Sequence, residues 1–337
     1  MKATTRRRGA LAGTGLALSL ALALTGCGNV TTASEPAEGD SYPTGPVTLT
    51  VGQSAGGSSD LIARAVAEHA SDALGVAVPV VNKPGANGAL ATLEVASAKP
   101  DGQTLILLNA SLFAITPLAV PESEAVSLDD VEVVAGISQD DYVLLANVDS
   151  GYQSIDDLKN AGKAFNFGTT GVGTGSQLAQ SLVFKAAGIE GTDIPFDGGS
   201  PALVALLGNQ VDLTVVQLGE AMPQIEAGKV TPIVVFSAER NQYLKDVPTA
   251  TEEGYDVIVS QFRAIGAPKG TPEPILKKLR EAFAEGFATD SYQDFNKQGL
   301  FTPAELDADK VVSSWTAAAK NYKSLTEEYD ISMGGGN

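Results

Sequence analysis

The stretch "VTLTVGQSAGGSSDLIARAVAEHASDALG", Val47–Gly75, joins two different hydrophobic patterns through one glycine-rich turn. Its first part, "VTLTVGQ", is rich in apolar and β-branched residues, which predicts a strand. The second part, "SSDLIARAVAEHASDALG", has apolar residues at helical spacing and ends at a glycine, which predicts an amphipathic helix. A strand, a short turn and a helix form the repeating unit of α/β proteins.

The same alternation continues along the chain. The segments "VAVPVVN" (76–82) and "TLILLN" (104–109) predict strands, and "GALATLEVASA" (88–98) predicts the helix between them. A short, fully apolar run such as "TLILLN" is typical of a strand that is buried in a parallel sheet. We therefore expect βαβ units in this part of the chain.

A second α/β series begins near Ser150 and is followed by two long helices. Strands are predicted at 164–170, 192–196, 211–217 and 231–238, and helices at 154–162, 175–188, 200–209, 271–288 and 308–329. The last two helices have no sheet of their own, so they must return to the first series to bury their apolar faces. We expect an α/β fold of two lobes, each a mostly parallel sheet flanked by helices. Residues 42–147 and 256–334 form one lobe, and residues 148–255 form the other.

The first residues have the composition of an export signal. Four cations precede an apolar run, Gly9–Leu24, and "LTGC" (24–27) closes it. This order predicts a secretory signal over residues 1–26, whereas the run is marginally short for an uncleaved membrane anchor. The "LTGC" stretch resembles the lipobox of bacterial lipoproteins, which implies that Cys27 is lipidated. Residues 27–41 are small and polar and suit a flexible tether.

Composition excludes several classes of function. Cys27 is the only cysteine, so the chain can form no internal disulfide or cysteine metal cluster. Without the four leader cations, 18 basic residues face 40 acidic ones, a net charge of −22. Such a chain repels nucleic acid and anionic membrane surfaces. We expect no nucleic-acid partner, no metal and no cofactor.

The glycine-rich turns do not match catalytic or nucleotide motifs. Gly52–Gly56 fits the G-x-S-x-G pattern of a hydrolase, but the only histidine, His69, lies ten residues beyond Ser59, roughly 15 Å along the helix. A phosphate-binding loop requires lysine where Ser58 stands. In "GTTGVGTGSQ" (168–177), Ser176 replaces the third glycine of the dinucleotide fingerprint. Hydrolase and nucleotide-binding functions are therefore disfavoured.

Both turns nevertheless suit an anionic ligand. Each leads from a strand to the start of a helix, where backbone N–H groups and the helix dipole favour negative charge. The alternative is capping alone, with Ser58, Ser59 and Ser176 as N-caps. Two such turns, one in each lobe, favour a ligand held between them. Asp60 and Arg64 are expected to form a surface pair on the first helix.

An ordered set of segments resembles a known family. These segments include "YPTGPVTLTVGQSAGGSSDLIAR", "VVNKPGANGALATLEVASAKPDGQTL", "FGTTGVGTGSQLAQSLVFKAAG" and "RAIGAPKGTPEPILKKL". They resemble the solute-binding proteins of tripartite tricarboxylate transporters, also called Bug-type receptors, from about Tyr42 to the C-terminus. The resemblance implies a two-lobed periplasmic-binding fold of type II, no catalysis, and a carboxylate gripped by the turns of both lobes. The residues it implies at the site are Ser54, Ala55, Gly56, Gly57, Ser58, Ser111, Thr170, Gly171, Gly173, Thr174, Gly175 and Ser176.

The chain departs from the common family pattern at places that include the following two. After "VDL" it reads "VVQLGE" (215–220), where many members have an aspartate-containing segment, and Arg263 follows an apolar run. These positions tune the ligand, so Gln217 and Arg263 are added as binding candidates, although Arg263 could instead form an interlobe salt bridge.

The resemblance implies an exported, monomeric lipoprotein that is not an enzyme. Such a protein captures a small carboxylate, a di- or tricarboxylate or an aromatic one, and delivers it to the permease subunits of a membrane transporter. The alternative is a ligand-sensing lipoprotein that reports to a membrane signalling partner. The sequence does not choose between these two roles.

Overall fold

The structure is a computed structural model that describes residues 41–334. The predicted signal peptide (1–26), the lipidation site Cys27 and almost all of the tether lie outside the described residues. Within residues 41–334, no helix is both long and apolar enough to cross a bilayer.

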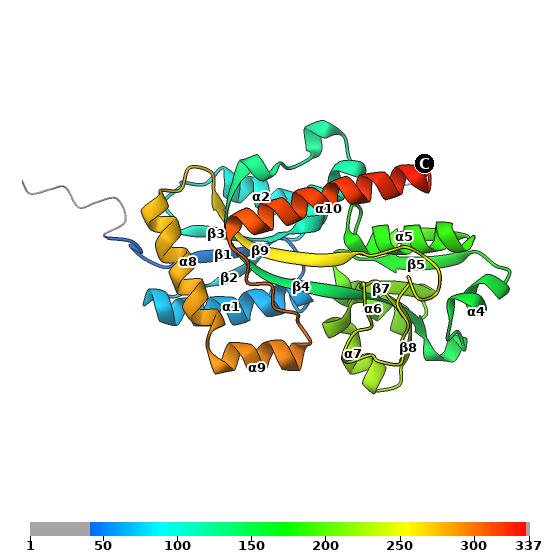
Figure 1. Ribbon diagram of the computed structural model, residues 1–337. Helices are drawn as coiled ribbons and strands as arrows, with labels where there is room; N and C mark the ends of the chain where they lie inside the picture. The colour runs from blue at the N-terminus through cyan, green and yellow to red at the C-terminus, as the bar shows by residue number, and fades with distance from the viewer. Residues whose placement is uncertain (1–40, 335–337) are drawn as a thin grey trace, which may run out of the picture. The chain divides into compact units, whose positions relative to one another are not determined.

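The described residues form one nine-stranded sheet with helices on both faces (Figure 1). Eight strands lie in the order β2 (Val80–Asn82), β1 (Thr48–Val51), β3 (Thr104–Asn109), β9 (Ser260–Pro268), β4 (Val131–Asn147), β7 (Leu213–Gln217), β5 (Phe165–Thr169) and β6 (Gly191–Pro195). The ninth, β8 (Val230–Val235), pairs with β4. The α/β class is confirmed.

The sheet is mixed. The strand β1 pairs in parallel with β2 and β3, and β5 pairs in parallel with β6 and β7. The strands β4 and β9 run antiparallel to their neighbours. Parallel strands therefore form the two outer parts, as predicted, and an antiparallel pair joins them in the centre.

The long strand β4 divides the sheet into two halves. It pairs with β9 up to Asp141 and with β7 and β8 from Tyr142 onward. We call β1, β2, β3, β9 and residues 131–141 the A half. We call β5, β6, β7, β8 and residues 142–147 the B half. The residue boundaries of the two lobes stay a prediction.

Among the described residues, seven of the ten α-helices lie close to predicted positions, whereas α3, α7 and α9 were not predicted. They are α1 (Ser58–Leu74), α2 (Ala89–Ala96), α3 (Ala110–Ala114), α4 (Ile155–Asn160), α5 (Gly175–Ala187), α6 (Gly199–Leu207), α7 (Leu218–Glu226), α8 (Glu273–Phe287), α9 (Asp290–Gly299) and α10 (Ala308–Glu328). The helix α1 ends at Gly75 and α5 at Gly188, both in the left-handed conformation that glycine adopts without strain. These two glycines explain why both helix ends were predictable.

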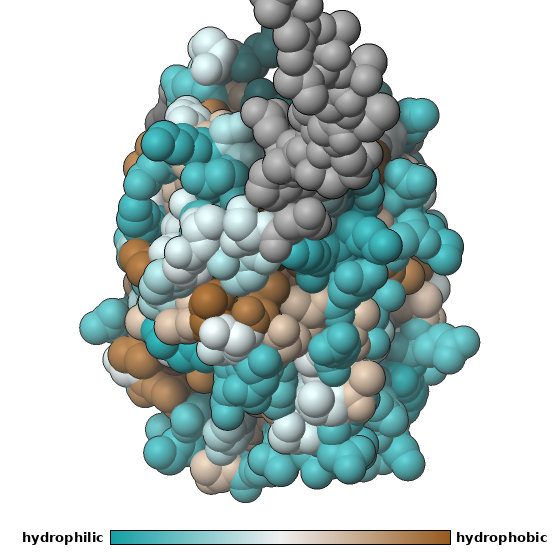
Figure 2. All heavy atoms as spheres, turned by 90° about the vertical axis from the view of Figure 1, so that its left-hand side faces the viewer, coloured by the Kyte–Doolittle hydropathy of each residue, from teal (hydrophilic) through white to brown (hydrophobic). Residues whose placement is uncertain are grey.

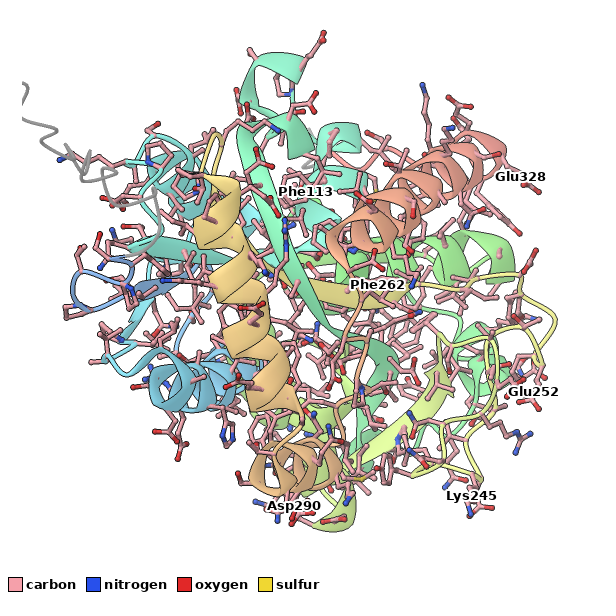
Figure 3. All side chains as sticks on the ribbon, turned by 60° about the vertical axis from the view of Figure 1, so that its left-hand side comes forward. Phe113, Lys245, Glu252, Phe262, Asp290 and Glu328 are labelled. Atoms are coloured by element: carbon pink, nitrogen blue, oxygen red, sulfur yellow. The ribbon has the colours of Figure 1, made fainter. Side chains whose placement is uncertain are left out.

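The C-terminal helices pack on the halves in different ways. The helix α8 lies against α1, and Leu279 shares a buried core with Ile62. The helix α10 starts on the A half, where Trp315 belongs to a core that Phe113 and Phe262 partly cover (Figure 3). Further along, Tyr322 belongs to the core of α5 and β5 in the B half. The last helix therefore contacts both halves.

The side of the molecule at the left of Figure 1 is mostly hydrophilic, with small separated apolar patches (Figure 2).

Candidate ligand-binding site

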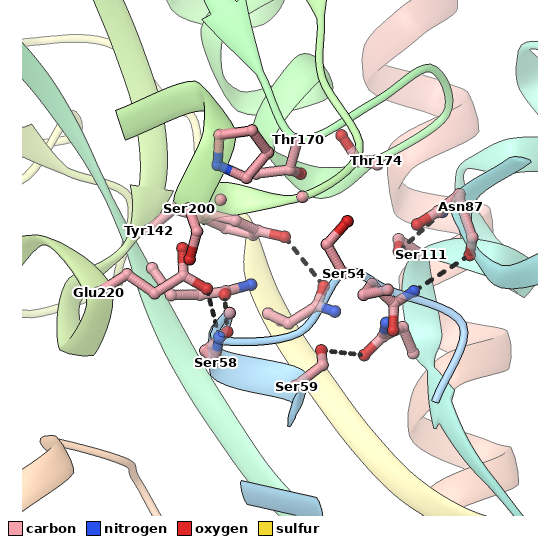
Figure 4. Close-up of a pocket in the computed structure, with 18 residues that line it drawn as sticks. Ser54, Ser58, Ser59, Asn87, Ser111, Tyr142, Thr170, Thr174, Ser200 and Glu220 are labelled. Atoms are coloured by element: carbon pink, nitrogen blue, oxygen red, sulfur yellow. Dashed lines mark hydrogen bonds between the residues drawn. The ribbon is translucent and has the colours of Figure 1, made fainter. Parts of the chain in front are cut away.

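A small pocket lies where the first glycine-rich turn faces the B half (Figure 4). Its volume is about 30 Å³, close to that of a single water molecule. Seven of the predicted site residues line it: Ser54, Gly57, Ser58, Ser111, Thr170, Thr174 and Gln217. The structure therefore brings residues of both predicted turns to one place.

The other predicted residues lie around this pocket rather than on its wall. Gly171 lines a neighbouring hollow together with Thr170. Outside the pocket lining stand Ala55, Gly56, Gly173, Gly175, Ser176 and Arg263. Ser176 is fully buried, donates its hydroxyl to Val215 O at 2.6 Å and accepts from Thr170 N at 3.2 Å. It shapes the second turn without facing the pocket.

The first turn is held by a carboxylate. Gly56 has φ 83° and donates its N–H to Asp60 Oδ2 at 2.9 Å. Asp60 is buried, accepts from Asn82 Nδ2 and pairs with Arg64. Burial favours the neutral acid, but the hydrogen bonds from Arg64, Gly56 and Asn82 outweigh it and lower the pKa of Asp60. The predicted pair of Asp60 and Arg64 is present, but only Arg64 lies at the surface, because the carboxylate is buried and faces the turn.

The helices are capped by residues other than those expected. The N-cap of α1 is Gly57, which has no side chain to cap with, and Ser58 and Ser59 lie inside the first helical turn. The N-cap of α5 is Thr174, whose hydroxyl accepts from Gln177 N. The N-cap expectation for Ser58, Ser59 and Ser176 was therefore wrong.

The second turn requires a glycine. Gly173 has φ 71°, and a Cβ there would lie 2.7 Å from Thr116 Cα. Its carbonyl accepts from Asn87 Nδ2 at 3.1 Å and from Thr116 Oγ1 at 3.0 Å. The turn of the B half is thus in direct contact with the A half.

A carboxyl group that was not predicted from the sequence binds a backbone N–H at the start of α1. Glu220, in the first turn of α7, accepts the N–H of Ser58 at 2.5 Å through Oε1 (Figure 4). Its Oε2 is shielded from solvent and has no hydrogen-bond partner among residues 41–334. Desolvation raises the pKa of Glu220, although the Ser58 hydrogen bonds oppose this effect. The only sequence signal was the unusual "VVQLGE" segment (215–220). Within it, Gln217 was predicted as a binding residue and Glu220 was not.

More hydrogen bonds join the two halves beside the pocket. The hydroxyl of Ser200 donates to Gly56 O at 3.0 Å, and that of Ser58 donates to Gln217 Oε1. Since these bonds connect α1 and its turn to α6 and β7, the site is closed in this structure.

Arg263 supports the pocket from behind. It is 1% exposed, forms a salt bridge with Asp140 on the adjacent strand β4, and donates to Ser58 Oγ at 2.6 Å and Ser59 Oγ at 3.2 Å. Because Asp140 and Arg263 both belong to the A half, this pair does not bridge the halves. The guanidinium instead fixes the two serine hydroxyls at the start of α1.

Comparison with known proteins identifies the family. A family model described as "Tripartite tricarboxylate transporter family receptor" matches residues 62–330. The chain belongs to this family. It is a receptor family and not one of enzymes, which confirms the prediction that the protein has no catalytic role.

Relatives and solved structures agree with this membership. A UPF0065 protein from the ttuE-ttuC' intergenic region of Agrobacterium vitis is 37% identical over 80% of this chain and 81% of the relative. BugT of Bordetella pertussis is 30% identical over 82% of this chain and 86% of the relative. The structure of the periplasmic binding protein BugD has a TM-score of 0.81 at 29% identity, covering 86% of this chain and 99% of BugD. The two-lobed binding-protein fold is confirmed, and an exported location is supported.

Among the described residues, no group of three or more His, Cys, Asp and Glu side chains could hold a metal ion.

Proposed function

We propose that this receptor captures a small carboxylate in the pocket between the two halves and delivers it to the permease subunits of a tripartite tricarboxylate transporter. We further propose that it is a monomeric lipoprotein, held to the outer face of the membrane through Cys27. The observation that carries the proposal is the meeting of the two predicted turns at one closed pocket.

Two related structures support a carboxylate as the ligand. MatC from Rhodopseudomonas palustris, with bound malate, has a TM-score of 0.79 at 28% identity, covering 84% of this chain and 99% of MatC. A second R. palustris protein, with adipate, has a TM-score of 0.82 at 25% identity, covering 86% of this chain and 99% of that protein. In this chain the hydroxyls of Ser111 and Thr170 and the backbone N–H groups at the start of α6 line the pocket and supply donors for a carboxylate.

Binding requires the halves to open and close. The pocket in this structure is small and is bridged by hydrogen bonds between the halves, so the ligand enters an open form, and closure then removes it from water. Binding and closure are therefore coupled, and a ligand that prefers the closed form stabilises it.

A thermal-shift screen of di-, tri- and aromatic carboxylates tests the binding role. At about a hundredfold excess over its dissociation constant, the true ligand stabilises the folded state by roughly 2.7 kcal/mol, and the melting temperature rises. Gly57→Val should abolish the shift, because its φ of −79° accepts a side chain while the new methyl groups enter the pocket.

Gly45→Val is the matched control, since a Cβ there meets only Gln103 Nε2, at 3.9 Å, away from the pocket. The binding role is wrong if Gly57→Val binds as wild type does, or if only neutral compounds shift the melting curve.

Intact-mass analysis of membrane-extracted protein tests the anchor, which requires a chain that begins at a lipidated Cys27. Ligand uptake in cells that lack the permease distinguishes transport from sensing: uptake is lost in the first case and unchanged in the second.

A further inference from the structure

The pocket wall holds a protein carboxyl group and no cationic side chain. Glu220 lines it, and no lysine or arginine is among its lining residues. Arg263, behind the wall, is already paired with Asp140. The strongest unsatisfied group at the site is therefore a protein carboxyl, although the proposed ligand is an anion.

Glu220 takes the position where an incoming carboxylate would be expected. The Ser58 N–H stands at the start of α1, where the helix dipole favours an anion, and Glu220 Oε1 accepts it at 2.5 Å. A second carboxylate at this end of the pocket finds the donor occupied and lies directly beside another carboxyl group. Dicarboxylates are disfavoured on both counts.

The second oxygen of Glu220 lacks a donor. Oε2 is shielded from solvent without a hydrogen-bond partner in residues 41–334, and leaving a buried charged acceptor unpaired is costly. It lies against the backbone of Gly199, where any Cβ would overlap it. The residue thus lines the pocket and holds, beside Gly199, a buried acceptor that has no donor among residues 41–334.

The opposite end of the pocket carries the hydroxyls of Ser111 and Thr170, whereas the Asn87 amide and the Thr174 hydroxyl there already donate within the protein. Figure 4 shows Glu220 on one side and Asn87 and Ser111 on the other, with Thr170 and Thr174 along the top. The two ends therefore differ in chemistry: one holds the only carboxyl group of the lining, and the other holds neutral hydroxyl and amide groups, including the unpaired Gln53 Oε1.

From this polarity we infer that Glu220 determines specificity, and that the receptor selects a ligand with a protonated amino group beside its carboxylate. The ammonium group donates to Glu220 Oε2, and the carboxylate accepts from the hydroxyls of Ser111 and Thr170 at the other end. This inference rests on the proposed function and narrows its ligand class.

Calorimetry on the mature full-length protein tests the inference with matched compounds. The probes are the α- and ω-amino acids of two to six carbons, the dicarboxylates of the same chain lengths, and the N-acetyl derivative of each amino acid that binds. We expect the best amino acid to bind at least tenfold more tightly than its dicarboxylate partner. N-acetylation, which removes the positive charge, should reduce that affinity at least tenfold.

Two variants separate charge from shape. Glu220→Gln keeps the acceptor for Ser58 N–H and removes the charge, so we expect the amino acid to lose at least tenfold in affinity and dicarboxylates to gain. Glu226→Gln removes the same charge from the exposed far end of α7, and should bind as wild type does. The N-acetyl comparison uses wild-type protein and keeps the test decisive if Glu220→Gln does not fold.

The results separate failure of this inference from failure of the proposed function. If dicarboxylates bind wild type as tightly as the amino acids do, or N-acetylation leaves affinity unchanged, the role of Glu220 is wrong while carboxylate binding stands. If no carboxylate of either class binds wild type or Glu220→Gln, the proposed function fails and this inference fails with it.

Discussion

Ser58 connects the buried charges on the two sides of the site. Its backbone N–H donates to Glu220 and its hydroxyl donates to Gln217. The hydroxyl oxygen also accepts a hydrogen bond from Arg263. One residue at the start of α1 thus contacts an acid from the B half and a base from the A half. The serine itself is held on three sides, so its position is fixed before any ligand arrives.

Arg263→Met should destabilise the fold by about 3–5 kcal/mol, because it leaves Asp140 buried without its positive partner. Urea denaturation measures the loss. The double variant Arg263→Met/Asp140→Leu should recover more than half of it, since an apolar pair replaces both charges. Arg280→Met is the control: its pair with Glu273 lies at the surface, and its effect should stay within about 0.5 kcal/mol. A single variant as stable as wild type would contradict a structural role for the Arg263–Asp140 pair.

The elements that local patterns define were predictable, and those that depend on distant partners were not. The helices α1 and α5 have terminal glycines and clear apolar spacing, and both were predicted. The strand β4 was not, because Gln139, Asp140 and Asp141 interrupt its apolar pattern. Distant residues such as Arg263 and Asn241 satisfy the two aspartates. Glu220 was missed for the same reason, since its partner Ser58 lies 162 positions away in the chain.

Trp315→Ala should lower the free energy of unfolding by about 3–5 kcal/mol, because it removes a large, fully buried side chain from α10. The indole stacks on Phe113 at 5.6 Å between ring centroids, and Phe113 shares α3 with Ser111 of the pocket. Circular dichroism during chemical denaturation measures the effect. Val312→Ala, at a position 39% exposed on the same helix, should change stability by less than about 0.5 kcal/mol. Equal effects of the two variants would show that α10 does not depend on this contact.

At the scale of the whole molecule, the halves are joined through the sheet, through α10 and across the pocket. They share the continuous strand β4, whose pairing passes from β9 to β7 and β8 at Asp141 and Tyr142. Across the pocket they are joined only by side-chain and turn contacts, such as those of Ser200 and Thr116. Register shifts in β4 at residues 133–138 and 144–145 mark places where the strand departs from regular pairing and bends readily. The strand is thus suited to act as the hinge, and the contacts across the pocket as the latch.

Ser200→Ala removes one of these latch contacts, the hydrogen bond from its hydroxyl to Gly56 O. A hydrogen bond of this kind contributes about 0.5–1.5 kcal/mol, so the balance between closed and open forms should shift roughly two- to tenfold toward the open form. Because the ligand leaves only from the open form, its release in stopped-flow measurements should accelerate by the same factor. Ser313→Ala is the control, since that exposed hydroxyl donates only within α10, to Lys310 O. Small-angle scattering should give ligand-free Ser200→Ala a larger radius of gyration than wild type, and saturating ligand should remove the difference. An unchanged release rate together with an unchanged radius would show that the Ser200 contact does not hold the halves closed.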